Sequence, residues 1–170
     1  MSEVFQDYEV PAVRPTFITV LCILTFIGSG WGLIGGAIQY FSADKQALSM
    51  SITKEQVAND IQKGDKNDAG TKMAEKMVNS MSGAFTAENL KKTGIASIVG
   101  ALFCLVGAFL MWQLKKNGFY LYIAGTLIGV ISPFVIYGTD NLMSIISSVM
   151  VGFIGIVFII LYGVNLKHMK

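Results

Sequence analysis

The fold is decided by residues 15–40, which read PTFITVLCILTFIGSGWGLIGGAIQY. This stretch contains no charged residue and no histidine, and it is longer than the about 20 apolar residues that a helix needs to cross the hydrocarbon core of a bilayer. Three more stretches, 93–114, 119–138 and 143–164, have the same character. The sequence therefore predicts an all-α, polytopic membrane protein built as a bundle of four transmembrane helices.

The composition of the whole chain agrees with this prediction and excludes other classes of protein. Of its 170 residues, 53% are hydrophobic and 14% are charged, whereas soluble domains carry about 25% charged residues. The net charge of +2 is too small for an extended nucleic-acid surface, so the expected surroundings are a lipid bilayer. Cys22 and Cys104 lie inside predicted spans, where we expect small buried side chains and no disulfide.

The one large polar segment, residues 41–92, lies between the first two spans and holds eight lysines and seven acidic residues. Apolar residues recur at helical spacing over roughly 49–62 and again over roughly 71–82. Between them, residues 64–70 are dense in Gly, Asp and Asn, which favour turns. These patterns predict a helical hairpin outside the membrane, and Thr86 is a suitable N-cap for the helix that follows it.

Three methionines of the second hairpin helix, Met73, Met77 and Met81, recur four residues apart. They predict an apolar face that packs against the bundle or lies on lipid headgroups. Thioether sulfur also binds Cu(I), but no His or Cys accompanies these methionines. We therefore expect no metal site and no other cofactor.

The distribution of Lys and Arg near the spans indicates the orientation of the chain. The tails 1–14 and 165–170 and the turn after the second span share one side, and their basic residues are Arg14, Lys115, Lys116, Lys167 and Lys170. Because basic loops stay on the cytoplasmic side, both termini are predicted to be cytoplasmic. The eight lysines of segment 41–92 oppose this orientation, and the acidic residues beside them complicate the comparison.

The most specific motif inside a span is Gly28-Ser-Gly-Trp-Gly32-Leu-Ile-Gly-Gly36, in which glycines recur at every fourth position. Small residues at this spacing let two helix backbones approach closely in lipid, where no hydrophobic force drives helices together. Other spans carry similar pairs, namely Gly125 with Gly129 and Ser148 with Gly152. These faces either bind another subunit or pack within the chain's own bundle, and the sequence leaves both interpretations open.

Two further residues stand out inside the predicted spans. Pro133 removes a backbone hydrogen bond and should kink the third span, either as a gate or as a packing adjustment. Trp31 lies near the middle of the first span, where its indole N–H needs a partner. It is expected to line a cavity or to pack against the glycine face of another helix.

Catalytic residues are scarce in this sequence. The histidine His168 lies in the C-terminal tail, and Asp140 is the one acidic residue near the bilayer outside segment 41–92. A general base, a metal centre or an ion-coupling site inside the membrane cannot be assembled from them, so we do not expect an enzyme. Hydroxyl side chains in the spans are expected to hydrogen-bond between helices or to the carbonyl oxygen four residues earlier in their own helix: Thr19, Thr25, Ser29, Thr126, Ser132, Ser144, Ser147 and Ser148.

Two stretches, RPTFITVLCILTFIGSG at 14–30 and KNGFYLYIAGTLIG at 116–129, resemble a group of small four-helix bacterial membrane proteins without an assigned activity. The resemblance covers the hydrophobic parts of the chain and implies a bacterial inner membrane. It supplies no functional residue.

The sequence favours a non-catalytic accessory subunit that assembles with a membrane-protein partner or with itself. Its small-residue faces and its hairpin would make the contacts. The alternatives are a channel or facilitator for a neutral or apolar small molecule, in which Pro133 and Trp31 shape the path, and a protein that binds or senses lipid through the hairpin.

Overall fold

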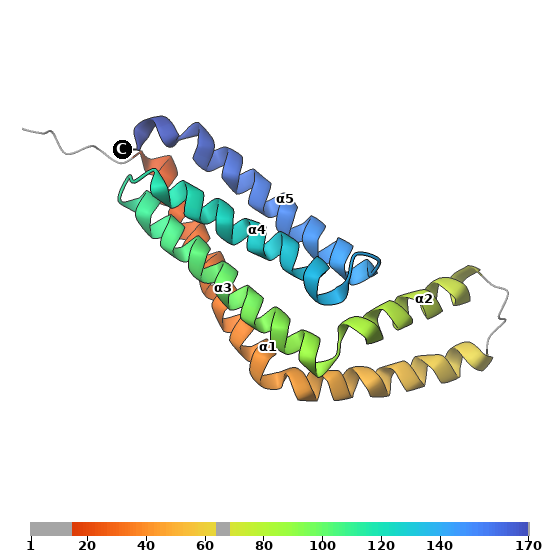
Figure 1. Cartoon of the computed structure of the whole chain (residues 1–170). Coiled ribbons are helices and arrows are strands. Elements are labelled where there is room, and N and C mark those ends of the chain that lie inside the picture. Colours follow the sequence, from red (N-terminus) through yellow and green to blue (C-terminus); the bar gives the residue numbers. More distant parts are fainter. Residues whose placement is uncertain (1–14, 64–68, 170) are drawn as a thin grey trace, which may run out of the picture.

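The computed structural model describes residues 15–63 and 69–169, and every regular element within these ranges is a helix (Figure 1). The predicted tail 1–14 and most of the predicted turn 64–70 lie outside the described residues. The elements in chain order are α1 (Thr16–Lys63), α2 (Ala69–Ala84), α3 (Ala87–Trp112), α4 (Asn117–Tyr137), α5 (Leu142–Val164) and the short 3-10 helix η1 (Leu166–His168).

Four of the described helices, α1, α3, α4 and α5, are long and apolar enough to cross a membrane. Their outer surfaces carry large apolar side chains, and Ile27, Val135 and Phe153 are 66%, 78% and 70% exposed. Apolar surface on this scale is unfavourable in water and favourable in hydrocarbon. The predicted four-helix membrane bundle is thereby confirmed.

Helix α1 extends beyond the span that the sequence predicts, because it continues without a break to Lys63. Residues 41–63 contain neither glycine nor proline, so nothing in the sequence ends the helix at the membrane surface. The helix expected over roughly 49–62 is therefore the outer part of α1 and no separate element. Figure 1 shows α1 bending as it leaves the bundle, with its outer part running beside α2 to form the hairpin.

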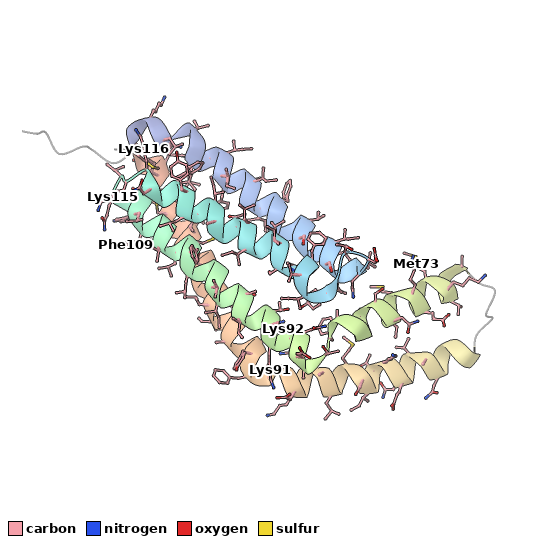
Figure 2. The ribbon with its side chains drawn as sticks, in the orientation of Figure 1. Met73, Lys91, Lys92, Phe109, Lys115 and Lys116 are labelled. Atoms are coloured by element: carbon pink, nitrogen blue, oxygen red, sulfur yellow. The ribbon has the colours of Figure 1, made fainter. Side chains whose placement is uncertain are left out.

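Two pairs of lysines mark the ends of α3. Figure 2 shows Lys91 and Lys92 where the hairpin joins the bundle, and Lys115 and Lys116 at the opposite end. The part of α3 that follows Lys92, residues 93–112, rises about 30 Å, which matches the about 30 Å of a bilayer's hydrocarbon core. The lysines thus lie where the chain would meet the two membrane surfaces.

The beginning of α1 and the end of α5 meet at one end of the bundle, away from the hairpin (Figure 1). The Thr25 hydroxyl and the Tyr162 hydroxyl are 2.8 Å apart and join the two helices. The buried residues around them, here named the core cluster, are Ile18, Leu21, Cys22, Met111, Tyr122, Tyr162 and Met169. The described ends of the chain therefore share one side of the bundle.

Glycines set the closest approaches between neighbouring helices. A Cβ atom on Gly94 of α3 would lie 2.8 Å from the carbonyl oxygen of Gly36 on α1, nearer than real Cβ atoms come. Where α3 meets α4, a Cβ on Gly107 would lie 2.8 Å from the carbonyl oxygen of Gly118. Since both obstacles are backbone atoms, only glycine permits these two helix pairs to pack at this distance.

Candidate functional site

A cleft of about 360 Å³ lies between the four membrane helices. Volumes of roughly 300–1,000 Å³ between the helices of a bundle are typical of small-molecule sites. The residues that line it come from all four helices: Leu24, Thr25, Gly28, Ser29 and Gly32 of α1; Ala96, Ser97, Gly100, Ala101 and Cys104 of α3; Tyr122, Gly125, Thr126 and Gly129 of α4; Val151, Ile154, Gly155 and Phe158 of α5.

The cleft lies near the middle of the membrane. Ser29 is about midway between Thr16, where α1 begins, and the predicted end of the first span at Tyr40. Thr126 is likewise near the centre of α4. A molecule held between them would therefore lie among the lipid tails and far from both headgroup layers.

One end of the cleft is closed by the core cluster. The hydroxyl pair of Thr25 and Tyr162 bridges α1 and α5 there, and the rings of Tyr122 and Tyr162 pack with their centroids 5.3 Å apart. The cleft opens sideways, because Leu24 of α1 and Ile154 of α5 line it and are still 50% and 56% exposed. The opening thus faces the lipid between α1 and α5.

The cleft has apolar walls with a few hydroxyl groups. No Asp, Glu, Lys, Arg or His is among the described residues that line it. The Thr126 hydroxyl donates to the Tyr122 carbonyl oxygen at 3.0 Å, as expected for a threonine within a helix. The Ser29 side chain is only 7% exposed, and within the described parts of the chain its hydroxyl makes no hydrogen bond.

The three regularly spaced glycines of the first span, Gly28, Gly32 and Gly36, differ in the space beside them. A Cβ on Gly32 would lie 3.3 Å from the Ala101 Cβ, and one on Gly36 would lie 2.9 Å from the Gly94 carbonyl oxygen. These two positions pack against α3 inside the chain. Gly28 differs, because a Cβ there would meet no atom within 4 Å. Of the three, Gly28 alone leaves room for another molecule.

The predicted small residues of α4 and α5 also lie between helices. Cβ atoms on Gly129 and Gly152 would lie 3.0 Å and 3.5 Å from Val151 and Val130 side-chain carbons. One on Gly125 would lie 2.8 Å from the Gly100 carbonyl oxygen. The Ser148 hydroxyl donates across to the Val130 carbonyl oxygen at 2.8 Å. The packing of α4 against its neighbours accounts for these positions.

The sequence predicts that Trp31 lines a cavity or packs against the glycine face of another helix. In the structure it does not line the cleft and does not pack on a glycine face. Its side chain is 79% exposed on the outer surface of the bundle. The physical reason is the helical period: Ser29 points inward, and two residues along an α-helix turn the side chain by about 200°. Trp31 is therefore a lipid-facing side chain within the described chain.

Pro133 is buried inside α4, and its carbonyl oxygen accepts a hydrogen bond of 3.2 Å from the Ser144 hydroxyl of α5. It lies outside the cleft lining. The contact ties α4 to α5 close to the turn that joins them, where Gly138 has a φ of 88°. Its position fits the packing interpretation better than a gate.

The methionine face of α2 is mostly uncovered. Met73 is 73% exposed and Met77 46% exposed, whereas Met81 is partly buried nearer the bundle. Figure 2 shows Met73 in the outer part of the hairpin. The hairpin touches the α4–α5 turn through Asn141, whose side-chain amide donates to the Ser80 carbonyl oxygen at 3.2 Å. Only the inner part of α2 thus packs against the bundle.

Sequence reasoning identified the lining hydroxyls but not the cleft. The sequence predicts that Thr25, Ser29 and Thr126 hydrogen-bond between helices or to a carbonyl oxygen one turn earlier. Thr25 does the first and Thr126 does the second. The spacing of Thr25, Ser29, Gly32 and Gly36 marks the inner face of α1. Nothing in the sequence indicates that α5 stays apart from that face along most of its length.

In comparisons with protein-family models, curated proteins and solved structures, no match to this chain was found. The resemblance to small bacterial four-helix membrane proteins stays a prediction. The function is therefore inferred from the cleft and the residues that line it.

Proposed function

We propose that this protein is a non-catalytic integral membrane protein that holds a small apolar molecule in the cleft between its four helices. The observation that carries the proposal is the form of the cleft, which is closed by the core cluster at one end and open to lipid between Leu24 and Ile154. The absence of charged side chains from its described lining suits an uncharged occupant.

The size of the cleft suits a small molecule. Its volume of about 360 Å³ lies within the roughly 300–1,000 Å³ that is typical of small-molecule sites. The core cluster also favours binding over conduction, because a path across the membrane would have to pass between tightly packed rings such as Tyr122 and Tyr162.

The test fills the cleft with a leucine side chain. Gly28→Leu places the side chain in open space within the lining, so we expect the helix bundle to form normally and the occupant to be lost. Gly35→Leu is the matched control, because Gly35 also has open space around it but does not line the cleft.

The full chain is purified from its membrane in mild detergent, and native mass spectrometry records the bound mass that is released on activation. A defined small mass on the wild type and on Gly35→Leu, absent from Gly28→Leu, would support the proposal. An equal mass on all three proteins, or none on the wild type, would refute it. Thermal unfolding of each variant verifies that the fold is kept.

A second candidate function is assembly with another membrane protein, and the exposure of Trp31 favours it. An indole that is 79% exposed on the lipid-facing surface, with Met73 similarly exposed on the hairpin, offers two anchors for a partner. The same purification decides this candidate: a heavier complex present in the wild type and lost in Trp31→Ala would support it. A bacterial inner membrane and cytoplasmic termini are part of our proposal for its location.

A further inference from the structure

The Ser29 hydroxyl belongs to a deeply buried residue that lines the cleft, and it makes no hydrogen bond in the described chain. Its side chain is 7% exposed. A hydroxyl removed from water is unfavourable unless it finds a partner, and lipid tails offer none. A partner that enters the cleft with a hydrogen-bonding atom would remove this penalty.

Two neighbouring hydroxyls of the cleft differ from that of Ser29, because each has a hydrogen-bond partner inside the protein. Thr25 is paired with the Tyr162 hydroxyl at 2.8 Å, and Thr126 donates to the Tyr122 carbonyl oxygen at 3.0 Å. Each is satisfied inside the protein, and Thr25 belongs to the closed end. Ser29 lies one turn further along α1, beside the open space at Gly28. Its hydroxyl is thus available where an occupant would be.

The other residues that line the cleft define the polarity and the charge of its occupant. Side chains of Leu24, Val151, Ile154 and Phe158 form apolar walls, and no described lining residue carries a charge. A charged group here would lack a counter-ion in a medium of low dielectric constant, so the occupant is neutral. The opening toward lipid lets a long apolar tail leave the cleft and stay in the bilayer.

We infer that the cleft binds a neutral lipid through a carbonyl or hydroxyl oxygen that hydrogen-bonds to Ser29, with its tail between α1 and α5. This inference rests on the proposed function and adds the chemical class of the ligand. Diacylglycerols and long-chain isoprenoid quinones share this chemistry, since both combine an uncharged oxygen with a long hydrocarbon tail. A hydrocarbon without oxygen lacks it.

The experiment titrates three probes into the full chain in phosphatidylcholine nanodiscs: dioleoylglycerol, a long-chain isoprenoid quinone and the hydrocarbon squalene. Native mass spectrometry measures the bound fraction for the wild type, Ser29→Ala and the control Ser132→Ala. Ser132 lies in the membrane but outside the cleft. We expect Ser29→Ala to weaken the binding of an oxygen-containing probe about fivefold, the usual effect of losing one neutral hydrogen bond. We expect Ser132→Ala to leave the binding of every probe unchanged.

Comparison of the two oxygen-containing probes shows whether the cleft binds a diacylglycerol or a quinone. Binding of either probe to the wild type, with weaker binding to Ser29→Ala, supports the inference. Squalene binding as tightly as both of them, or Ser29→Ala binding as the wild type does, would overturn it. Gly28→Leu distinguishes failure of the inference from failure of the proposed function. If Gly28→Leu abolishes binding and Ser29→Ala does not, the cleft binds lipid without using this hydroxyl; if neither variant has an effect, the proposed function fails as well.

Discussion

At the scale of single residues, glycine decides how closely the helices pack. We expect Gly94→Ala to destabilise the bundle by about 1–3 kcal/mol, the usual cost of overpacking a tight contact. The added methyl group would lie 2.8 Å from the Gly36 carbonyl oxygen and 3.0 Å from the Tyr40 backbone nitrogen, and backbone atoms cannot move aside cheaply.

The measurement for Gly94→Ala is thermal unfolding in detergent, followed by circular dichroism. Gly35→Ala is its control, because no atom lies within 4 Å of the place that its methyl carbon would take, and alanine favours helix more than glycine does. A Gly94→Ala protein that unfolds at the same temperature as Gly35→Ala would contradict the role assigned to the α1–α3 contact.

Residues also show where sequence reasoning succeeds. Thr86 is the predicted N-cap, and its hydroxyl accepts a hydrogen bond of 3.2 Å from the Asn89 backbone N–H, because capping depends only on neighbouring residues. Trp31 shows the opposite. Its position in the middle of a span suggests a buried role, but which face of α1 turns inward depends on where α3 and α5 lie.

At the scale of elements, the hairpin is held to the bundle by few contacts. Asn141 has two roles there: its side-chain oxygen accepts from the Met143 backbone N–H at 2.9 Å and caps α5, and its amide donates to the Ser80 carbonyl oxygen of α2. Asn141→Asp keeps the acceptor for the cap and removes the donor. We expect faster hydrogen exchange in α2 and unchanged exchange at the start of α5.

Hydrogen–deuterium exchange with mass spectrometry of the full chain measures both helices in one experiment. Asn141→Ala is the comparison variant, because it removes the cap as well and should loosen both α2 and the beginning of α5. Protection of α2 that is the same in Asn141→Asp and in the wild type would show that this hydrogen bond does not hold the hairpin.

The elements themselves were predictable to different degrees. The four spans follow from composition, because about 20 apolar residues in succession have no stable alternative to a membrane helix. The continuity of α1 was missed because the change from apolar to polar residues near Tyr40 resembles a boundary. Composition changes there while helix propensity does not, and Figure 1 shows the chain bending instead of ending its helix.

At the scale of the whole molecule, the hairpin and the α3–α4 turn lie at opposite ends of the bundle (Figure 2). Cysteines introduced by Met73→Cys in the hairpin and by Lys116→Cys in the turn should therefore react from different sides of the membrane. With cytoplasmic termini, a membrane-impermeant maleimide added to intact cells should label Met73→Cys, and Lys116→Cys should need permeabilised cells.

The labelling is done in a background in which Cys22 and Cys104, neither of which forms a disulfide, are changed to alanine. That background without an added cysteine is the control and should stay unlabelled. Labelling of both introduced cysteines from the same side would contradict the four-span topology. The reverse pattern would keep the topology and invert the orientation.

The cleft could not be predicted at this scale from the sequence. Its existence requires that α1 and α5 meet at the Thr25–Tyr162 pair and then separate, and a hydrophobicity pattern records no distance between helices. The inward-facing residues of α1 were identifiable by their period, and the space beside them was not.

The sideways opening between α1 and α5 also determines how the protein would sample its surroundings. A molecule that reaches the cleft from the lipid arrives by two-dimensional diffusion within the leaflets, so its mole fraction in the bilayer sets the occupancy and its aqueous concentration does not. The occupancy of the cleft would then depend on the lipid composition of the membrane that contains the protein. Vesicles without the ligand, added to a sample, would lower the occupancy because the ligand would be diluted into their lipid.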